Sequence, residues 1–289
     1  MEKVAFVILT YKNIVDTIEC VQSIKGTLLD EFQKTIIVID NSEVTSYLDE
    51  IKKDKSIYCY SVKNEGYSAG NNYGIKKAIE AGCEYIVVIN NDTIVEKDFA
   101  LPLLTFLKNN KKSIVAPVIM SYYDRTIWSS GGKYRCLLKD YKMLNNPIKR
   151  IRKTDFATGC CFATTKEVFD EIGYLKEEYF MYNEDAEFCH RANKNHISIF
   201  VLPDSVIFHK ISASTAPNSP FQLYYIYRNR IIFAREEYSG LSKIYAVFIN
   251  IIKAHYRYFS YKLKHKNKEA MAVLFAIKDS KASRGRYRY

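Results

Sequence analysis

Apolar runs and amphipathic stripes alternate along the first 120 residues of the chain. Runs of six or seven largely apolar residues occupy positions 4–10, 35–40, 57–62, 84–89 and 113–118. Such runs are typical of strands that are buried on both faces of a parallel sheet. Helical patterns lie between them, at residues 13–25, 45–53, 68–81 and 97–109. This strand–helix alternation predicts an α/β fold, a parallel sheet with helices on both faces.

The second half of the chain is less regular. Glycine and asparagine pairs punctuate the region around residues 131–147. Beyond it, the pattern predicts a helix at 165–172, with Thr165 as its N-cap and Gly173 at its end. A second helix is predicted at 183–193, strands at 197–202 and 205–209, and mostly helical structure from residue 221 onward.

Polar residues cluster where four of the predicted strands end. They are Thr10-Tyr11, Asp40-Asn41, Asn64-Glu65-Gly66 and Asn90-Asn91-Asp92. Ligands of parallel α/β sheets bind beyond the carboxyl ends of the strands. One such polar end is weak evidence because loops are generally polar, but four together favour a ligand site in one crevice.

The stretch NEGYSAGNNYG, residues 64–74, surrounds the predicted start of a helix with glycines and asparagines. Glycine lets the backbone approach a ligand closely, and a helix N-terminus favours phosphate. The spacing differs from the G-x-G-x-x-G dinucleotide fingerprint. A flexible turn is the alternative interpretation.

The stretch YNEDAEFCHR, residues 182–191, places three carboxylates, Glu184, Asp185 and Glu187, in the first turn of a helix that Asn183 is expected to cap. Acids at this position are common because they stabilise helix N-termini. Asp185, however, shares a helical face with three residues suited to burial, namely Phe188, Cys189 and Ala192. A carboxylate that points inward needs a partner or a task.

His209 ends the apolar run SVIFH. A single histidine at a strand end is usually structural, so it becomes a candidate metal ligand only if Asp92 lies near it.

The positive charge of the chain is concentrated at its end. The net charge is +11, and residues 221–289 contain 15 Lys/Arg against 4 Asp/Glu, whereas residues 1–220 carry 28 of each sign. Basic residues are mixed with aromatic ones, as at Arg228 and Arg230. This composition predicts contact with an anionic surface, lipid or nucleic acid. The alternatives are a solvated tail, helices that pack on the catalytic domain, or a homodimer through the C-terminal helices.

The seven cysteines are dispersed without a C-x-x-C pair, which indicates reduced thiols rather than a zinc or redox site. The N-terminal apolar run is too short for a signal peptide, and no apolar stretch approaches the ~18 residues that span a bilayer. We therefore expect a cytoplasmic protein, peripheral on the inner face of the plasma membrane.

Six motifs in order carry a resemblance: VILTYKN, VIDNS, NEGYSAGNNYG, VINND, ATGCCFATTKEVFDEIG and FMYNEDAEFCHR. Together they resemble the family-2 glycosyltransferases with the GT-A fold, and most closely the bacterial rhamnosyltransferase-like branch, over residues 4–235. The resemblance implies a mixed, Rossmann-like sheet with helices on both faces, followed by a C-terminal helical segment. It also implies inverting transfer of a sugar from a nucleotide-diphosphate donor, dTDP-rhamnose or a UDP-hexose, to a glycan or lipid-linked acceptor in cell-surface polysaccharide synthesis.

The resemblance further implies roles for individual residues. The expected nucleotide-sugar-binding residues are Thr10, Tyr11, Asp40, Asn64, Gly70, Asn71, Asn90 and Asn91; the metal ligands are Asp92 and His209; and the catalytic pair is Glu184 and Asp185, with Asp185 as the base. The metal is Mn²⁺ or Mg²⁺, and the histidine favours Mn²⁺ modestly. Two departures from the family's pattern occur: Asn90 replaces the first acid of D-x-D, and the turn DNSEVTSY lacks the usual glycine.

The resulting division is a catalytic domain at 1–220, with a nucleotide-sugar half (1–120) and an acceptor half (121–220), and basic, aromatic-rich helices at 221–289. Two other function classes fit the sequence less well. A nucleotidyltransferase would need a glycine-rich basic loop near the first strand, and LTYKNIVDT has one lysine and no glycine. A nucleic-acid-binding protein would leave the neutral first 220 residues with their polar crevice unexplained.

Overall fold

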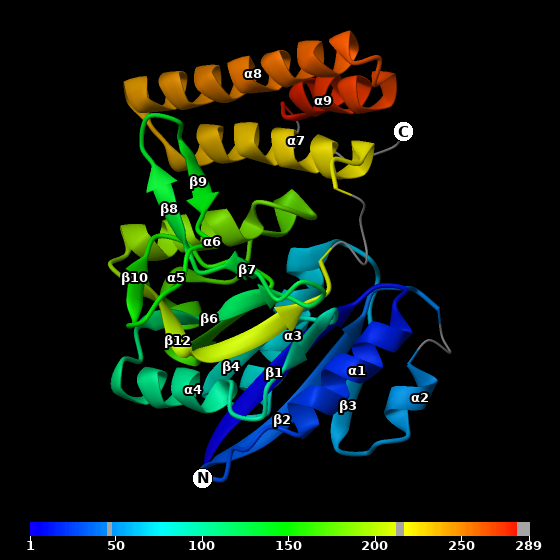
Figure 1. Ribbon diagram of the computed structural model, residues 1–289, viewed down its shortest axis with the longest axis vertical. Coiled ribbons are helices and arrows are strands. Elements are labelled where there is room, and N and C mark those ends of the chain that lie inside the picture. The colour runs from blue at the N-terminus through cyan, green and yellow to red at the C-terminus, as the bar shows by residue number, and fades with distance from the viewer. Residues whose placement is uncertain (45–47, 212–216, 282–289) are drawn as a thin grey trace.

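The protein is described from a computed structural model, which covers residues 1–44, 48–211 and 217–281 (Figure 1). Its strands are β1 (Glu2–Thr10), β2 (Phe32–Asp40), β3 (Ile57–Ser61), β4 (Tyr85–Asn90), β5 (Thr93–Val95), β6 (Ser113–Ser121), β7 (Ile127–Ser129), β8 (Gly132–Arg135), β9 (Asp140–Met143), β10 (Arg152–Thr154), β11 (Cys161–Thr165) and β12 (Ser198–His209). Its α-helices are α1 (Ile14–Lys25), α2 (Asp49–Lys52), α3 (Tyr67–Glu80), α4 (Ala100–Asn109), α5 (Lys166–Ile172), α6 (Glu184–Lys194), α7 (Pro220–Glu237), α8 (Gly240–Leu263) and α9 (Asn267–Asp279).

A large mixed sheet runs through the molecule in the order β10-β12-β6-β11-β4-β1-β2-β3. Strands β4, β1, β2 and β3 pair in parallel, as the alternating pattern predicts. Strand β11, in contrast, inserts antiparallel to both β4 and β6. The apolar pattern alone predicted a purely parallel sheet, which is wrong, and the mixed sheet implied by the family resemblance is confirmed.

Two further expectations about local structure differ from what is observed. The strands expected at 197–202 and 205–209 are one strand, β12, whose pairing with β6 shifts register between Leu202 and Val206. The helix expected at 45–53 is observed as the short α2, with Leu48 and Lys53 as its flanking caps, and residues 45–47 lie outside the described residues.

Alternate side chains of the central strand β1 point to opposite faces of the sheet. Val4, Phe6 and Ile8 pack in the core beneath α1 and α4, whereas Ala5 and Val7 pack in the core beneath α3, α5 and α6. Helices therefore cover both faces, as predicted.

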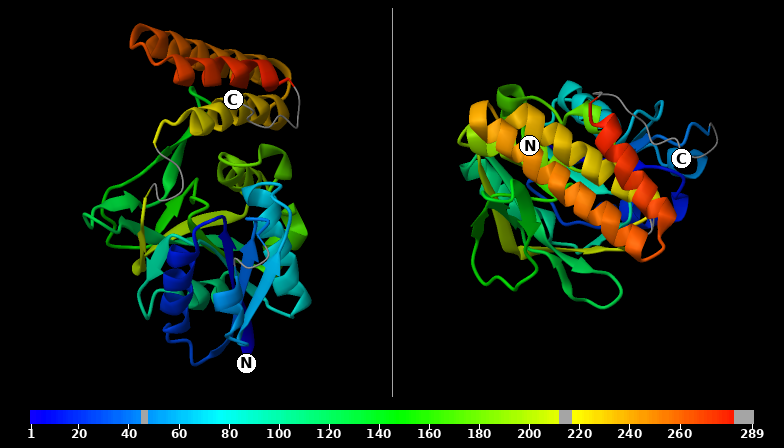
Figure 2. Two further views of the ribbon diagram at one scale, coloured as in Figure 1. Left: turned by 90° about the vertical axis from the view of Figure 1, so that its right-hand side faces the viewer. Right: turned by 90° about the horizontal axis from the view of Figure 1, so that it is seen from above.

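The three C-terminal helices stack at one end of the molecule, with α7 next to the α/β part that contains the large sheet and α8 and α9 outermost (Figure 2). The hairpin β8–β9 reaches this layer, where Lys253 Nζ of α8 donates to Asp140 Oδ2 at 2.8 Å and Tyr245 donates to the carbonyl of Leu137 at 2.8 Å. Within the residues described, no helix has the length and apolar character that crossing a membrane requires.

Candidate active site

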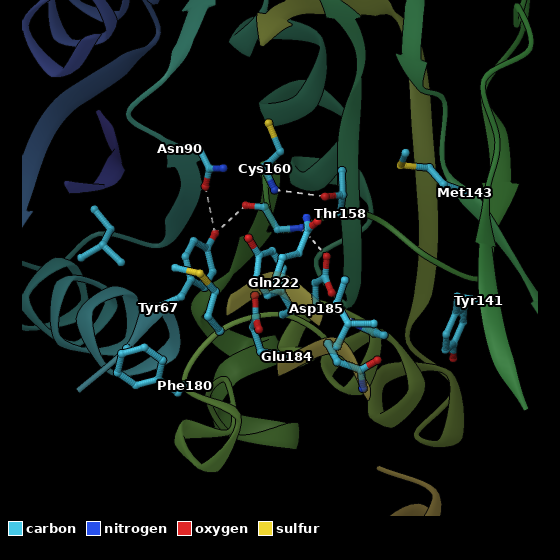
Figure 3. A pocket seen from close by; sticks show the side chains of 18 of the residues that line it. Tyr67, Asn90, Tyr141, Met143, Thr158, Cys160, Phe180, Glu184, Asp185 and Gln222 are labelled. Carbon is cyan, nitrogen blue, oxygen red and sulfur yellow. Dashed lines mark hydrogen bonds between the residues drawn. The ribbon is translucent and has the colours of Figure 1, made fainter. Parts of the chain in front are cut away.

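A cavity of about 950 Å³ opens at the carboxyl ends of the parallel strands, between the sheet and α7 (Figure 3). Its volume lies at the upper end of the range for small-molecule sites. One wall, which we call the strand-end wall, comes from the N-terminal half and includes Tyr11, Asn64, Asn90, Asn91 and Asp92. The facing elements are the segment 179–183, the start of α6 and one side of α7, which we call the α6–α7 wall.

Four of the residues implied to bind the nucleotide sugar do not line this cavity. Asp40 is fully buried at the end of β2, and its carboxylate accepts from the backbone N–H of Ser42 at 2.7 Å and from the Ser42 hydroxyl at 2.8 Å. Asn71 donates to the carbonyl of Tyr67 at 3.0 Å within α3. In this structure both residues support the strand-end wall from behind.

Thr10 and Asn91 belong to one buried hydrogen-bonded group. The hydroxyls of Thr10 and Thr17 are 2.7 Å apart, and Asn91 Nδ2 donates to the Thr17 hydroxyl at 3.0 Å. Asn91 reaches the cavity, and Thr10 lies directly behind it. The group ties the ends of β1 and β4 to α1, which makes this wall rigid before a ligand arrives.

Close packing explains two of the glycines in NEGYSAGNNYG. A Cβ on Gly70 would lie 2.4 Å from a methyl carbon of Leu9, so glycine lets α3 approach β1. Gly66 has φ +106°, and its Cβ would lie 2.2 Å from the carbonyl oxygen of Phe180. The backbone N–H of Tyr67 donates to that same oxygen at 2.6 Å. Gly66 therefore brings the start of α3 into contact with the segment that precedes Glu184 and Asp185.

Asp92 and His209, which are 117 positions apart, meet at the cavity because β5 pairs with the end of β12. His209 Nε2 lies 3.2 Å from Asp92 Oδ1, and both side chains are buried. Apart from this contact, Asp92 Oδ1 has no hydrogen-bond partner within the described residues. The ring of Trp128 packs edge-on against His209 at 4.7 Å and holds its orientation.

This pair fits a divalent cation that is completed by other ligands. One carboxylate oxygen and one imidazole nitrogen suit Mn²⁺, and a bound diphosphate and water can supply the remaining oxygen ligands. In the described part of the chain, no group of three His, Cys, Asp or Glu side chains is placed to hold a metal. The protein would therefore bind the metal together with the ligand.

Glu184 and Asp185 both line the cavity at the N-terminus of α6 (Figure 3). Asp185 Oδ2 accepts from the backbone N–H of Gly159 at 3.0 Å, and Asp185 Oδ1 accepts from that of Ala186 at 2.8 Å. Glu184 Oε2 is buried and has no hydrogen-bond partner within the described residues. The expected inward stripe is confirmed, since Phe188, Cys189 and Ala192 are all buried.

The two carboxylates differ in how well their charge is stabilised. Burial and the neighbouring charge of Asp185 raise the pKa of Glu184 to about 8. Burial also raises the pKa of Asp185, but the donors from Gly159, Ala186 and the Thr158 hydroxyl oppose that rise. Asp185 is therefore the better stabilised of the two as an anion, whereas burial and the neighbouring carboxylate favour the protonated form of Glu184.

The segment before α6 has unusual backbone geometry. Phe180, Tyr182 and Asn183 have positive φ values of 63°, 67° and 76°. Asn183 occupies the N-cap position, as predicted, but its side chain makes no hydrogen bond that caps the helix. The prediction that Asn183 caps α6 through its side chain is therefore wrong. Positive φ is strained for residues with a side chain and persists only where surrounding contacts enforce it.

The enforcing contacts come from α7, in a set we call the Asn229 clamp. The amide of Asn229 donates to the carbonyls of Tyr179, Met181 and Tyr182 at 2.9, 2.8 and 2.7 Å. Arg228, which is fully buried, donates to Asn229 Oδ1 at 2.7 Å. The sequence pattern assigned Arg228 to a membrane-facing basic surface, which is wrong for this residue because its side chain points into the protein.

Sequence reasoning also missed a link between the two walls. The Tyr67 hydroxyl donates to the carbonyl of Gly159 at 2.6 Å and to Asn90 Oδ1 at 3.2 Å (Figure 3). Gly159 in turn donates to Asp185. Tyr67 and Gly159 lie within NEGYSAGNNYG and ATGCC, so the motifs were visible, but only folding shows that they meet.

Comparison with known proteins shows the family of the chain. The sequence profile of glycosyl transferase family 2 matches residues 5–173. The chain is 30% identical over 244 residues to the low-salt glycan biosynthesis hexosyltransferase Agl10 of Haloferax volcanii, covering 83% of this chain and 78% of that protein. It is 25% identical over 228 residues to the dTDP-rhamnosyl transferase RfbF of Shigella flexneri, covering 74% and 75% respectively.

A solved structure of GalNAc-T7 with UDP, GalNAc and Mn²⁺ superposes with a TM-score of 0.64 at 16% identity, over 86% of this chain. The chain spans 55% of that protein, and at this identity the similarity concerns the fold alone. The protein belongs to glycosyl transferase family 2, has the GT-A fold and is a glycosyltransferase. This membership favours the glycosyltransferase interpretation over the nucleotidyltransferase and nucleic-acid-binding alternatives.

Proposed function

We propose that the protein transfers a sugar from a nucleotide-diphosphate donor to an acceptor hydroxyl in a metal-dependent, inverting single displacement. The observation that carries this proposal is the pairing, in one cavity, of an Asp92–His209 pair with a carboxylate couple of which one member, Asp185, accepts hydrogen bonds that stabilise its anion. The Asp92–His209 pair suits a cation that neutralises a leaving diphosphate, and the carboxylate couple suits a base.

Asp185 is the proposed base. Three hydrogen-bond donors stabilise its carboxylate anion, and the N-terminus of α6 adds a favourable dipole. An acceptor hydroxyl bound within ~2.6–3.2 Å of it could transfer its proton to Asp185 as the oxygen attacks the anomeric carbon. Attack from the side opposite the leaving group inverts that carbon and needs no enzyme nucleophile. Glu184, which holds a proton at neutral pH, can donate a hydrogen bond to the acceptor.

Asp92 and His209 would hold Mn²⁺ or Mg²⁺ against the donor. When bound, such an ion supplies positive charge to the leaving diphosphate. Asn90 and Asn91 present neutral amides at the same strand end, where they can hydrogen-bond the nucleotide or sugar without repelling phosphate. The presence of Mn²⁺ in the GalNAc-T7 structure supports a divalent metal on this fold.

The donor and acceptor classes follow from the relatives. RfbF is named for dTDP-rhamnose and Agl10 for hexose transfer in glycan biosynthesis, which supports dTDP-rhamnose or a UDP-hexose as donor and a glycan or lipid-linked acceptor here. The basic C-terminal segment supports work at an anionic membrane surface. We retain the division at residue 220 as a proposal, with the qualification that α7 lines the cavity through Gln222, Ile226 and Arg230.

The test is donor binding followed by turnover. UDP-, dTDP- and GDP-sugars are screened by thermal shift with and without Mn²⁺, and the best donor is then assayed for nucleotide-diphosphate release with an acceptor. One donor should raise the melting temperature more with Mn²⁺ than without it.

The variant Asp92→Asn should lose the Mn²⁺-dependent part of that shift and most of the turnover. The exposed Asp98→Asn serves as the matched control and should behave as wild type. If Asp92→Asn keeps both the metal-dependent shift and the turnover, the proposed metal site is wrong.

A further inference from the structure

Helix α8 carries a continuous apolar surface that faces away from the protein. The side chains of Leu241, Ile244, Phe248, Ile252, Phe259 and Leu263 are all exposed, and those of Leu241 and Leu263 are more than four-fifths exposed. Their spacings of three, four and seven residues place them on one side of the helix, which we call the α8 outer face. The opposite side, with Ala246, Asn250, Ala254 and Tyr261, is buried.

The α8 outer face is more apolar than is usual for a helix side that contacts only water. At 1.5 Å per residue the 24-residue α8 is about 36 Å long, and the outer face extends from its first turn to its last. Two tyrosines, Tyr245 and Tyr256, are exposed along the same side. Contiguous exposed apolar surface of this kind marks an interaction site.

The charges around the outer face have one sign. Helix α8 contains no Asp or Glu, and Lys243 and Lys262 lie near its two ends. Just beyond its C-terminus, Lys264, Lys266 and Lys268 are exposed and make no ion pair within the described part of the chain. A partner that covers the apolar side chains therefore meets uncompensated positive charge at its rim.

We propose that the α8 outer face docks on an anionic lipid leaflet, with α8 lying in the plane of the membrane surface. Phenylalanine, leucine and tyrosine suit the boundary between headgroups and acyl chains, and lysines suit anionic headgroups. A second copy of the chain fits less well. Pairing two α8 helices would bring lysine toward lysine, with no acidic side chain on either helix to form interhelical ion pairs.

The position of α8 connects this docking to the reaction. Helix α7 lies between α8 and the cavity, and one of its sides lines the cavity while another packs against α8 (Figure 1). Docking of α8 would hold the cavity at a fixed offset from the leaflet, because both α8 and α7 lie between them and two helix diameters amount to ~20 Å. Resting on the proposed function, this identifies the acceptor as a glycan carried on a membrane lipid.

The test uses the full chain and needs no sugar donor. Co-sedimentation is measured with vesicles of phosphatidylcholine alone and of phosphatidylcholine mixed with phosphatidylglycerol. Wild type should bind the mixed vesicles about ten-fold more tightly than the neutral ones. The double variant Phe248→Ser/Phe259→Ser should lose about ten-fold in affinity, and so should Lys264→Gln/Lys266→Gln/Lys268→Gln.

The control is Tyr123→Ser, which removes an exposed aromatic side chain far from α8 in the sequence and should bind as wild type. Melting temperatures of all variants should be unchanged, because the altered side chains are exposed. Equal vesicle binding by wild type and the α8 variants would overturn the proposal. A dimer in light scattering that Phe248→Ser/Phe259→Ser dissociates, with vesicle binding unaffected, would overturn it in favour of a second copy.

The two proposals fail separately. Nucleotide-diphosphate release with a water-soluble acceptor should be the same in wild type and in the α8 variants, because α8 does not line the cavity. Absence of that release in wild type would count against the proposed function, whereas vesicle binding is read without any turnover.

Discussion

The strand-end wall and the α6–α7 wall of the cavity are built in different ways. In the strand-end wall, polar groups satisfy one another over short distances, as Asp40 does with Ser42 and Thr10 with Thr17. In the α6–α7 wall, a segment with three positive φ values leads into the pair formed by Glu184 and Asp185. Asn229 of α7, more than 40 residues further along the chain, holds this segment in place.

The difference separates two tasks. The strand-end wall is a preformed surface whose amides and Asp92 can receive a nucleotide and a metal with little rearrangement. The α6–α7 wall holds two carboxyl groups side by side, and one of them, Glu184, is buried with an oxygen that has no hydrogen-bond partner within the described residues, which requires support from outside the local chain. Substitutions in the two walls should therefore have distinguishable effects on binding and on turnover.

The largest effect is expected from Asp185→Asn. The amide cannot accept the acceptor's proton, so kcat should fall by about 10²–10⁴-fold. The donor-induced thermal shift should stay as in wild type, because the strand-end wall is intact. The exposed Asp204→Asn is the control for loss of one acidic charge. A wild-type kcat in Asp185→Asn would show that another group takes the proton.

A smaller effect is expected from Asn229→Ala, which removes the clamp but touches no reacting atom. Release of the segment 179–183 should displace Asp185 and lower kcat by about 10–10²-fold, with donor KM unchanged. Asn250→Ala removes another buried asparagine, in α8, whose amide donates to the carbonyl of Ala246 at 2.9 Å. Both variants should lose stability, each by about 1–3 kcal/mol. If both also lose kcat equally, Asn229 has a general structural role and does not position the catalytic pair.

The smallest effect on turnover, and a clear one on stability, is expected from Glu184→Gln. The pKa of Glu184 is about 8 in the folded protein against an ordinary value of 4.5, so the folded state keeps a proton that the unfolded chain releases. This destabilises the wild type progressively as pH rises from about 4.5 to 8, after which the loss is constant. Glu184→Gln removes that loss.

Urea unfolding at pH 5, 7 and 9 measures the difference. The variant should match wild type near pH 5 and exceed it by a few kcal/mol at most above pH 8. The exposed Glu178→Gln should follow wild type at every pH. A constant offset between Glu184→Gln and wild type would mean that Glu184 titrates normally in the fold.

Much of the fold could be predicted from periodicity, because apolar spacing depends on local burial. The parallel strands β1 to β4 and the helices between them appear close to their expected bounds. Strand β11 could not be predicted in this way, because its short segment CFATT has no distinctive pattern and its direction depends on pairing with β4 and β6.

The residues of the candidate site also fall into those that local pattern predicts and those that it does not. Motif order predicted the site positions of Asp92, Asp185 and the strand-end asparagines, since each of them lies at the end or start of a regular element. The sequence did not predict the hydrogen bonds of Asn229, Tyr67 and Gly159 in the site, because their partners lie 23 to 92 positions away in the chain. Roles that depend on such distant contacts leave no local pattern.

The sequence by itself determined the order of the strands β1 to β4 and the helices between them, the polar strand ends and the concentration of basic charge after residue 220, because each of these follows from local composition. The tertiary structure decided that Asp92 meets His209, that Asp185 rather than Glu184 receives the hydrogen-bond donors, and that Arg228 turns inward while α8 turns its apolar face outward. These outcomes depend on burial and on partners from distant segments, which exist only once the chain has folded.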